Sequence, residues 1–174
     1  MAEEIINKVS QSVLLTLDLE KFYPAENIRI FDLKPFLFME LILKEKDFRA
    51  ALGATDWFQY KDEIVGIYCS ADAVIPVWAY MLVTSYLQPF AKEVIMGDEA
   101  TVLRQLITTR IQSIDLHEYK DKRVVIKGCG DKPVGDYAYL EITKMLMPVV
   151  KSIMYGEPCS TVPVFKSPNL KPKA

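Results

Sequence analysis

The chain has 174 residues, of which 51% are hydrophobic and 25% are charged, and its formal net charge is -2 at pH 7. Because the two signs of charge nearly balance, the composition argues against a polyanion-binding surface, and we expect no nucleic-acid partner. The longest apolar stretch, residues 73–87, is shorter than the roughly 20 residues of a membrane-spanning helix, so we expect no membrane partner. The chain begins acidic, without the plan of a secretory signal, which predicts a cytoplasmic protein.

The first part of the chain predicts two strands followed by one or two helices. Residues 11–19 are rich in leucine and β-branched residues, and residues 28–31 alternate apolar with polar side chains, as strands do. Residues 33–43 are apolar on nearly every helical turn, and residues 44–52 continue with helix formers before Gly53 supplies a stop.

The rest of the chain nearly repeats itself. Residues 56–97 align without a gap onto residues 115–156, and each copy predicts a turn, a strand, a cysteine loop, a helix and a return strand. The matched residues include Asp56 with Asp115, Tyr60 with Tyr119, Asp62 with Asp121, Asp72 with Asp131, and Gly97 with Gly156.

Strands that alternate with helices predict β-α-β crossovers and a mostly parallel sheet. The predicted elements of the two copies are strands at 64–68 and 123–127, helices from about 76 and 136, and return strands at 94–96 and 153–155, with a further helix at 99–113. We therefore expect a single α/β domain over residues 1–165, with a sheet of five or six strands, helices on both faces and an internal duplicated β-loop-α-β unit. Residues 166–174 are rich in proline and lysine, which predicts a disordered basic tail.

Three cysteines follow predicted strands: Cys69 and Cys129 after the first strand of each copy, and Cys159 after the last strand. In a chain without an export signal we expect them to be reduced thiols or metal ligands. Ligands collect at the carboxyl ends of parallel strands. Three thiolates, with Asp72, Asp131 or Glu157 as an oxygen ligand, are enough to hold a zinc ion or most of an iron–sulfur cluster, so these are the predicted cofactors.

Two other interpretations stay open. In the first, the protein is a thiol-dependent enzyme with Cys69 or Cys129 as nucleophile and Asp72 or Asp131 as proton carrier. In the second, the cysteines are buried packing residues, and exposed aromatic side chains form an oligomer interface such as that of a homodimer. His117 is the single histidine, which argues against a hydrolase built on a Ser-His-Asp or Cys-His arrangement.

Three segments of the chain carry a resemblance: Cys69–Tyr80, Lys127–Val134 and Gly156–Pro163. On these segments the chain resembles a bacterial family catalogued as domain of unknown function 2480, and the likeness runs from Ile6 to about Phe165. The family has no established activity, so the resemblance implies no reaction. Its genes are often found near iron–sulfur assembly genes, so the resemblance implies a protein partner in iron–sulfur assembly and a metal or sulfur role for the cysteines.

Overall fold

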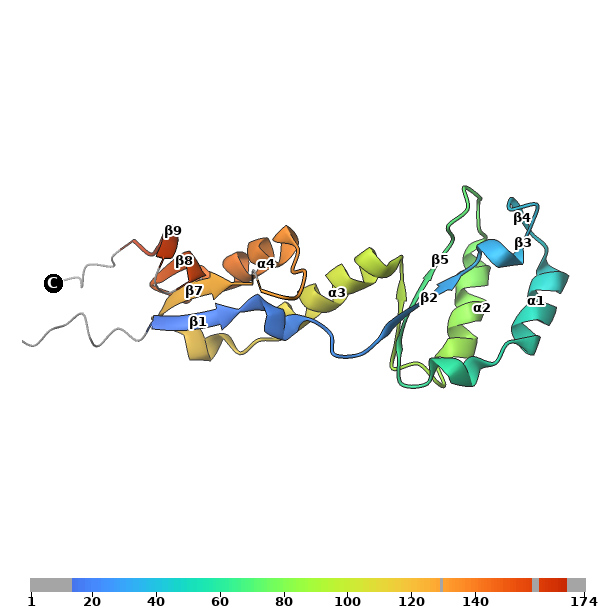
Figure 1. The fold of residues 1–174 in the computed structure, drawn as a ribbon, viewed down its shortest axis with the longest axis horizontal. Coiled ribbons are helices and arrows are strands. Elements are labelled where there is room, and N and C mark those ends of the chain that lie inside the picture. Colours follow the sequence, from blue (N-terminus) through green and yellow to red (C-terminus); the bar gives the residue numbers. More distant parts are fainter. Residues whose placement is uncertain (1–13, 129, 158–159, 169–174) are drawn as a thin grey trace, which may run out of the picture. The chain divides into compact units, whose positions relative to one another are not determined.

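The computed structural model describes residues 14–128, 130–157 and 160–168 (Figure 1). The chain divides into two compact units with mixed α/β structure. Unit 1 comprises the chain up to Tyr23 together with the part from Leu106 onward, and unit 2 runs from Pro24 to Gln105. Helix α3 (Glu99–Gln112) contains the residues at which unit 2 ends and unit 1 resumes. The two units are described separately.

Unit 2 is built on a three-stranded parallel sheet with the order β2-β5-β6. Its strands are β2 (Ile28–Asp32), β5 (Ile64–Tyr68) and β6 (Glu93–Met96), and helix α2 (Val77–Leu87) joins β5 to β6. A helical crossover of this kind is what a parallel pair of strands requires. The other elements are the hairpin of β3 (Leu37–Phe38) and β4 (Ile42–Leu43), helix α1 (Glu45–Ala54), and 3-10 helices at Lys34–Phe36 and Trp57–Tyr60.

The central strand β5 is buried on both faces. Val65 and Ile67 belong to a buried cluster that also contains residues of α1 and α2. On the other face, a Cβ atom added to Gly66 would lie 2.8 Å from Cγ2 of Val102 on α3. Helices therefore cover both faces of the sheet of unit 2, as predicted.

Unit 1 contains a four-stranded sheet with the order β1-β7-β8-β9. Three of its strands run parallel, β1 (Leu14–Asp18), β7 (Arg123–Lys127) and β8 (Ser152–Glu157), while β9 (Ser160–Lys166) is antiparallel to β8. Helix α4 (Asp136–Leu146) joins β7 to β8, and 3-10 helices form at Leu19–Phe22 and Leu116–Tyr119. The buried core includes Val124, Ile126 and Ile153 of the sheet and Ile142 and Leu146 of α4.

The described strands form sheets of four, three and two strands, not the single sheet of five or six strands that the sequence predicts. Strand β1 pairs with β7, and β2 pairs with β5, so each opening strand joins a different copy of the repeat. Leu14 lies opposite Arg123 although the two residues are far apart in the sequence. Periodicity along the chain predicts a strand but carries no information about its distant partner, so it could not predict this division.

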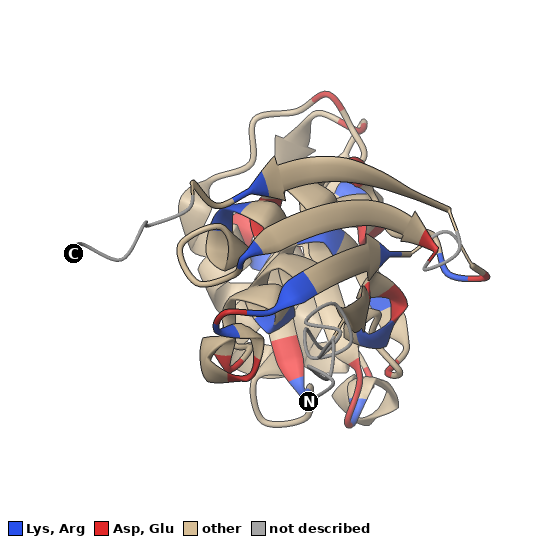
Figure 2. Ribbon diagram, turned by 90° about the vertical axis from the view of Figure 1, so that its left-hand side faces the viewer, with Lys and Arg blue, Asp and Glu red and all other residues tan. Residues whose placement is uncertain are grey.

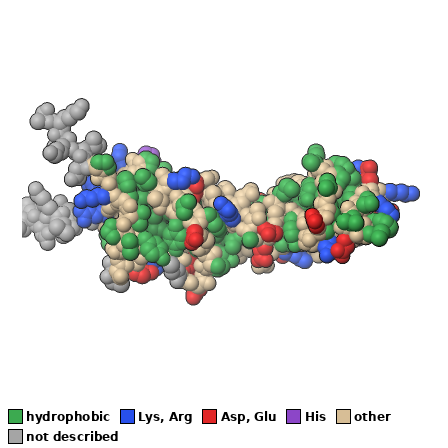
Figure 3. All heavy atoms as spheres, turned by 90° about the horizontal axis from the view of Figure 1, so that it is seen from above, with side chains coloured by type: hydrophobic (Ala, Val, Ile, Leu, Met, Phe, Trp, Pro, Cys, Tyr) green, Lys and Arg blue, Asp and Glu red, His purple; other side chains and the backbone are tan. Residues whose placement is uncertain are grey.

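Residues 37–43 form a short hairpin, so an α-helix over residues 33–43 is wrong, whereas α1 confirms the helix predicted over residues 44–52. Leu37 pairs with Leu43 and Phe38 with Ile42, and the turn between them places Met39 at a φ of 53°. Left-handed backbone of this kind is typical of tight hairpin turns. A short apolar run cannot be assigned to helix or strand by periodicity alone. Several apolar side chains of this hairpin are exposed, and Figure 3 shows hydrophobic side chains at the surface of both units.

Aligned positions of the repeat adopt similar backbone conformations. Asp62 and Asp121 have φ angles of 61° and 59°, and Gly97 and Gly156 also have positive φ. The backbone N–H of Asp62 donates to the carbonyl of Phe90 at 3.0 Å, and that of Asp121 donates to the carbonyl of Val149 at 2.8 Å. The aligned segments therefore share these local backbone features.

The predicted tail begins inside the sheet. Lys166 is the last residue of β9, and the backbone N–H of Ser167 donates to the carbonyl of Lys151 at 2.8 Å. The rest of that segment, residues 169–174, lies outside the described residues.

Candidate functional site

Cys69 directly follows the central strand of unit 2. Strand β5 ends at Tyr68, and its parallel pairing with β2 and β6 places the loop of residues 69–76 at the carboxyl end of the sheet. Cys69 is a free thiol with intermediate exposure, and part of its side chain packs against the hydrophobic core. The thiol thus lies at the edge of the sheet where ligands of parallel sheets collect.

Asp32 and Ser70 fix the start of this loop. Asp32 ends β2 and lies opposite Tyr68 of β5. The backbone N–H of Ser70 donates to Oδ1 of Asp32 at 2.9 Å, and the hydroxyl of Ser70 donates to Oδ2 at 2.5 Å. The backbone N–H of Lys34 donates to Oδ1 at 2.9 Å. Cys69 therefore sits between a residue of the sheet and a residue tied to the neighbouring strand.

These hydrogen bonds also set the charge of Asp32. Burial by itself would raise the pKa of Asp32, but the hydrogen bonds from Ser70 and from the backbone of Lys34, together with the positive charge of Lys34, bring it below its ordinary value. Asp32 is therefore a stable carboxylate at neutral pH. Its role in the described geometry is to hold the thiol-bearing loop.

Tyr80 is the ionisable group coupled to the thiol. It lies in the first turn of α2 and is half-buried. Burial and the negative charge of Cys69 raise the pKa of Tyr80 above its ordinary value. Asp72, the carboxylate that the sequence suggested for this loop, is exposed, and within the described residues it makes no hydrogen bond or ion pair.

Unit 1 shows a comparable strand end with a different set of charges. Lys127 ends β7, and its Nζ atom lies 3.3 Å from Oδ2 of Asp18 and 3.7 Å from Oε1 of Glu157. The hydrogen bond with Asp18 and the charges of both carboxylates raise the pKa of Lys127. Glu20 accepts a hydrogen bond from the backbone N–H of Gly130. Acidic side chains thus hold this loop as Asp32 holds its counterpart.

Sequence reasoning missed the two aspartates that end the opening strands. Asp18 and Asp32 each accept a hydrogen bond from the backbone N–H two residues further on, at 3.0 and 2.9 Å. Each also contacts the residue at or just after the end of the neighbouring central strand, Lys127 or Ser70. A signal was present, because the pattern Asp-Leu-x-x-Phe begins at both positions.

The predicted metal set is only partly described by the structure. Cys69 and Asp72 share one loop of unit 2, whereas Asp131 is an exposed residue of unit 1. Cys129 and Cys159 lie outside the described residues. Within the part of the chain that the structure describes, no group of three or more His, Cys, Asp or Glu side chains could hold a metal ion. Convergence of the three thiols stays a prediction.

The fold and these loops define a mixed α/β protein that carries a thiol loop after a central parallel strand. No helix in the described ranges is long and apolar enough to cross a membrane. The chain belongs to the family of proteins of unknown function called DUF2480, whose profile matches residues 3–167, and this confirms the resemblance seen in the sequence. No curated protein and no solved structure matches this chain.

Proposed function

We propose that this protein acts through surface thiols that bind a soft metal ion or carry sulfur, with Cys69 as the first of them. The observation that supports the proposal is the position of Cys69, which is partly exposed after the central strand β5, beside Ser70 and its two hydrogen bonds to Asp32. Thiolates are the protein ligands that zinc and iron–sulfur clusters favour, and they are also the nucleophiles of sulfur chemistry.

The sequence repeat extends the proposal to Cys129. We infer that the two β-loop-α-β segments are duplicated copies, because Asp62 and Asp121, and likewise Gly97 and Gly156, share their backbone conformations. On this inference Cys129, which the gapless alignment places one position later than Cys69, belongs to the equivalent loop of the second copy. A reducing compartment such as the cytoplasm keeps such thiols free, and an iron–sulfur assembly protein is a suitable partner for them.

A thiol-dependent enzyme is the second candidate, and one observation favours it. Burial and the negative charge of Cys69 raise the pKa of Tyr80, so a protonated phenol lies within electrostatic reach of the thiol at neutral pH. Asp72 is exposed and is a weaker candidate for that role. In this alternative, Cys69 attacks an electrophile and Tyr80 supplies the proton.

The experiment is an elemental analysis and an absorption spectrum of the protein purified without oxygen, together with mass spectrometry of its thiols. It is repeated for Cys69→Ser, Cys129→Ser and Cys159→Ser, with Glu93→Gln, which changes an exposed residue of β6, as a control that keeps every thiol and every candidate ligand. Stoichiometric zinc or iron, or an added sulfur atom on Cys69, that is lost in Cys69→Ser supports the proposal. A wild-type protein with neither metal nor added sulfur, whose Cys69 alone reacts rapidly with a thiol reagent, would favour the enzyme instead.

A further inference from the structure

A second feature lies at the opposite end of the sheet of unit 1, where β7 and β8 begin. A hollow of about 550 Å³ opens there, which is within the usual size range of small-molecule sites. Its lining combines basic, acidic and apolar side chains, among them Arg123, Lys151, Lys166, Asp121, Met154 and Phe165.

The strand register places two of the basic residues in one row. Arg123 of β7 lies opposite Ser152 of β8, and Ser152 lies opposite Lys166 of β9. Residues that are paired across neighbouring strands project from the same face of a sheet, and each strand is about 4.8 Å from the next. Arg123 and Lys166 therefore stand roughly 10 Å apart with the Ser152 hydroxyl between them. Figure 2 shows basic residues at the same ends of neighbouring strands.

Backbone hydrogen bonds hold this row in place. The N–H of Lys151 donates to the carbonyl of Lys122 at 2.7 Å, which ties the start of β8 to the segment before β7. The N–H of Ser167 donates to the carbonyl of Lys151 at 2.8 Å, which ties the end of β9 to the start of β8. The three cations are thus carried on connected backbone, so a ligand that binds them has little main chain to order.

The charges of this hollow do not cancel. Within the described residues, neither Arg123, Lys151 nor Lys166 forms an ion pair with a carboxylate. Asp121 is the acidic side chain among the described lining residues, so three positive charges face one negative charge. An excess of two positive charges matches the dianion of a phosphate monoester, whose charge at pH 7 is about -1.5 to -2. Arginine suits such an anion because its planar guanidinium donates two parallel hydrogen bonds to phosphate.

The apolar part of the lining indicates what the phosphate is attached to. Met154 lies two residues after Ser152 on β8, on the same face of the strand, and it is paired with Pro163 of β9. Together they give the hollow an apolar surface beside its basic row. We propose that this hollow binds an organic phosphate monoester, with the phosphate held by Arg123, Lys151 and Lys166 and the organic part packed on these apolar side chains. The site lies where β7 and β8 begin and does not depend on the proposed function.

The test is calorimetric titration of the full-length protein with phenyl phosphate and, separately, with inorganic phosphate. We expect saturable binding of phenyl phosphate that weakens as salt is added, and weaker binding of inorganic phosphate. The double variant Arg123→Gln/Lys166→Gln should bind phenyl phosphate at least tenfold more weakly, and so should Lys151→Gln. A matched control, Arg49→Gln/Lys144→Gln, removes one arginine and one lysine that pair with helix carboxylates and are not among the lining residues of the hollow, and it should bind as the wild type does.

Several outcomes would overturn the proposal. The wild type could bind neither probe, the double variant could bind phenyl phosphate as tightly as the wild type, or the control could lose affinity to the same degree. Equal affinity for the two probes would reject the organic part of the ligand. Because Arg123 and Lys166 are exposed, the variants should keep the circular dichroism spectrum of the wild type, which separates loss of binding from loss of fold.

Discussion

Ser70 donates hydrogen bonds to both carboxylate oxygens of Asp32, from its backbone N–H at 2.9 Å and from its hydroxyl at 2.5 Å. The two residues belong to segments that are distant in the sequence, since Asp32 ends β2 and Ser70 follows the thiol after β5. This pair joins β2 to the loop after β5 at the end of the sheet where Cys69 lies. Hydrogen bonds to a charged group are stronger than neutral ones, so this contact should matter both for stability and for the order of the loop.

Replacing Asp32 with asparagine should destabilise unit 2 by about 1–2 kcal/mol at pH 7, because Asn offers one acceptor oxygen and no charge. The folded-state pKa of Asp32 is lowered from its ordinary 3.8, so its carboxylate contributes stability above about pH 4. That contribution is lost as the pH falls through the folded pKa. The difference between Asp32→Asn and wild type should therefore be largest near pH 7 and shrink below pH 4, as measured by urea unfolding at several pH values.

The matched control for this prediction is Asp72→Asn, which removes a carboxylate from the same loop without breaking a hydrogen bond or ion pair among the described residues. It should change the unfolding free energy by less than about 0.5 kcal/mol. Labelling of Cys69 by a thiol reagent should accelerate in Asp32→Asn and not in the control. Equal labelling rates in both variants would show that Asp32 does not order the loop.

Gly66→Ala should destabilise the protein, because the strand centre has no room for a side chain. An added Cβ would lie 2.7 Å from Cδ1 of Ile30 and 2.8 Å from the backbone oxygen of Gly97. Because the backbone oxygen of Gly97 can move only if the neighbouring backbone is distorted, we expect the free energy of unfolding, measured in urea, to fall by about 1–3 kcal/mol.

Gly53→Ala is the opposite case and serves as the control. Gly53 lies within helix α1, and an added Cβ would meet nothing within 4 Å. Alanine should stabilise this helix by roughly 0.5–1 kcal/mol. If Gly66→Ala left the stability unchanged or raised it, the packing described around Gly66 would be wrong.

The local elements of the repeat could be predicted because their signals are local. The strands predicted at 64–68 and 123–127 coincide with β5 and β7, and the helix predicted at 99–113 closely matches α3. A single sequence predicts two patterns best: short apolar runs bounded by turns, which indicate strands, and helical spacing of apolar residues over a longer segment, which indicates a helix.

Pairing and turn geometry could not be predicted in the same way. The hairpin at 37–43 depends on left-handed backbone at Met39 and Glu40, residue types that seldom adopt it, so no glycine or asparagine marked the turn. For the candidate site, the strand-end position of Cys69 could be predicted from the order of elements. Its anchoring by Asp32 could not, because that required knowing that β2 lies beside β5.

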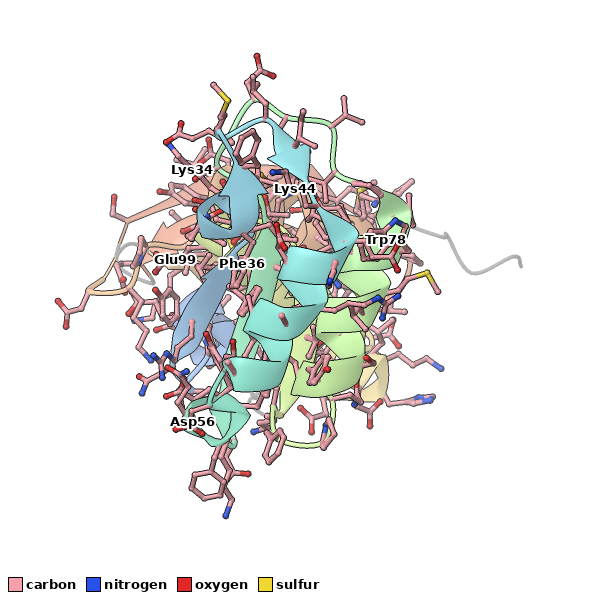
Figure 4. All side chains as sticks on the ribbon, turned by 90° about the vertical axis from the view of Figure 1, so that its right-hand side faces the viewer. Lys34, Phe36, Lys44, Asp56, Trp78 and Glu99 are labelled. Carbon is pink, nitrogen blue, oxygen red and sulfur yellow. The ribbon has the colours of Figure 1, made fainter. Side chains whose placement is uncertain are left out.

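Phe48→Ala should destabilise unit 2 by about 3–5 kcal/mol. Phe48 is 1% exposed, and its ring contacts those of Phe36 and Trp78 at centroid distances of 5.5 and 6.1 Å; Figure 4 labels both partners. Truncating such a buried aromatic leaves a cavity in addition to the lost transfer free energy. Both tryptophans of the chain, Trp57 and Trp78, lie in unit 2, so tryptophan fluorescence during urea unfolding reports on this unit.

Phe58→Ala is the control for Phe48→Ala, since Phe58 is 62% exposed and contacts the ring of Phe90 edge-on. It should cost less than about 1 kcal/mol. Similar losses for the two variants would mean that Phe48 is not part of the core.

The coupling between Cys69 and Tyr80 gives a prediction for the thiol site itself. Burial and the negative charge of Cys69 both raise the pKa of Tyr80, so Cys69→Ser removes one of the two causes. The pKa of Tyr80 should fall in that variant and yet stay above its ordinary value of 10.0, because the burial is unchanged.

Carbon-13 NMR of labelled tyrosine rings measures this titration, with the Tyr80 signal assigned from its absence in Tyr80→Phe. Cys129→Ser, which changes a thiol of unit 1, should leave the Tyr80 titration as it is in the wild type. An unchanged Tyr80 pKa in Cys69→Ser would show that the charge of Cys69 does not act on Tyr80. It would remove the support for an enzyme that uses the two side chains together.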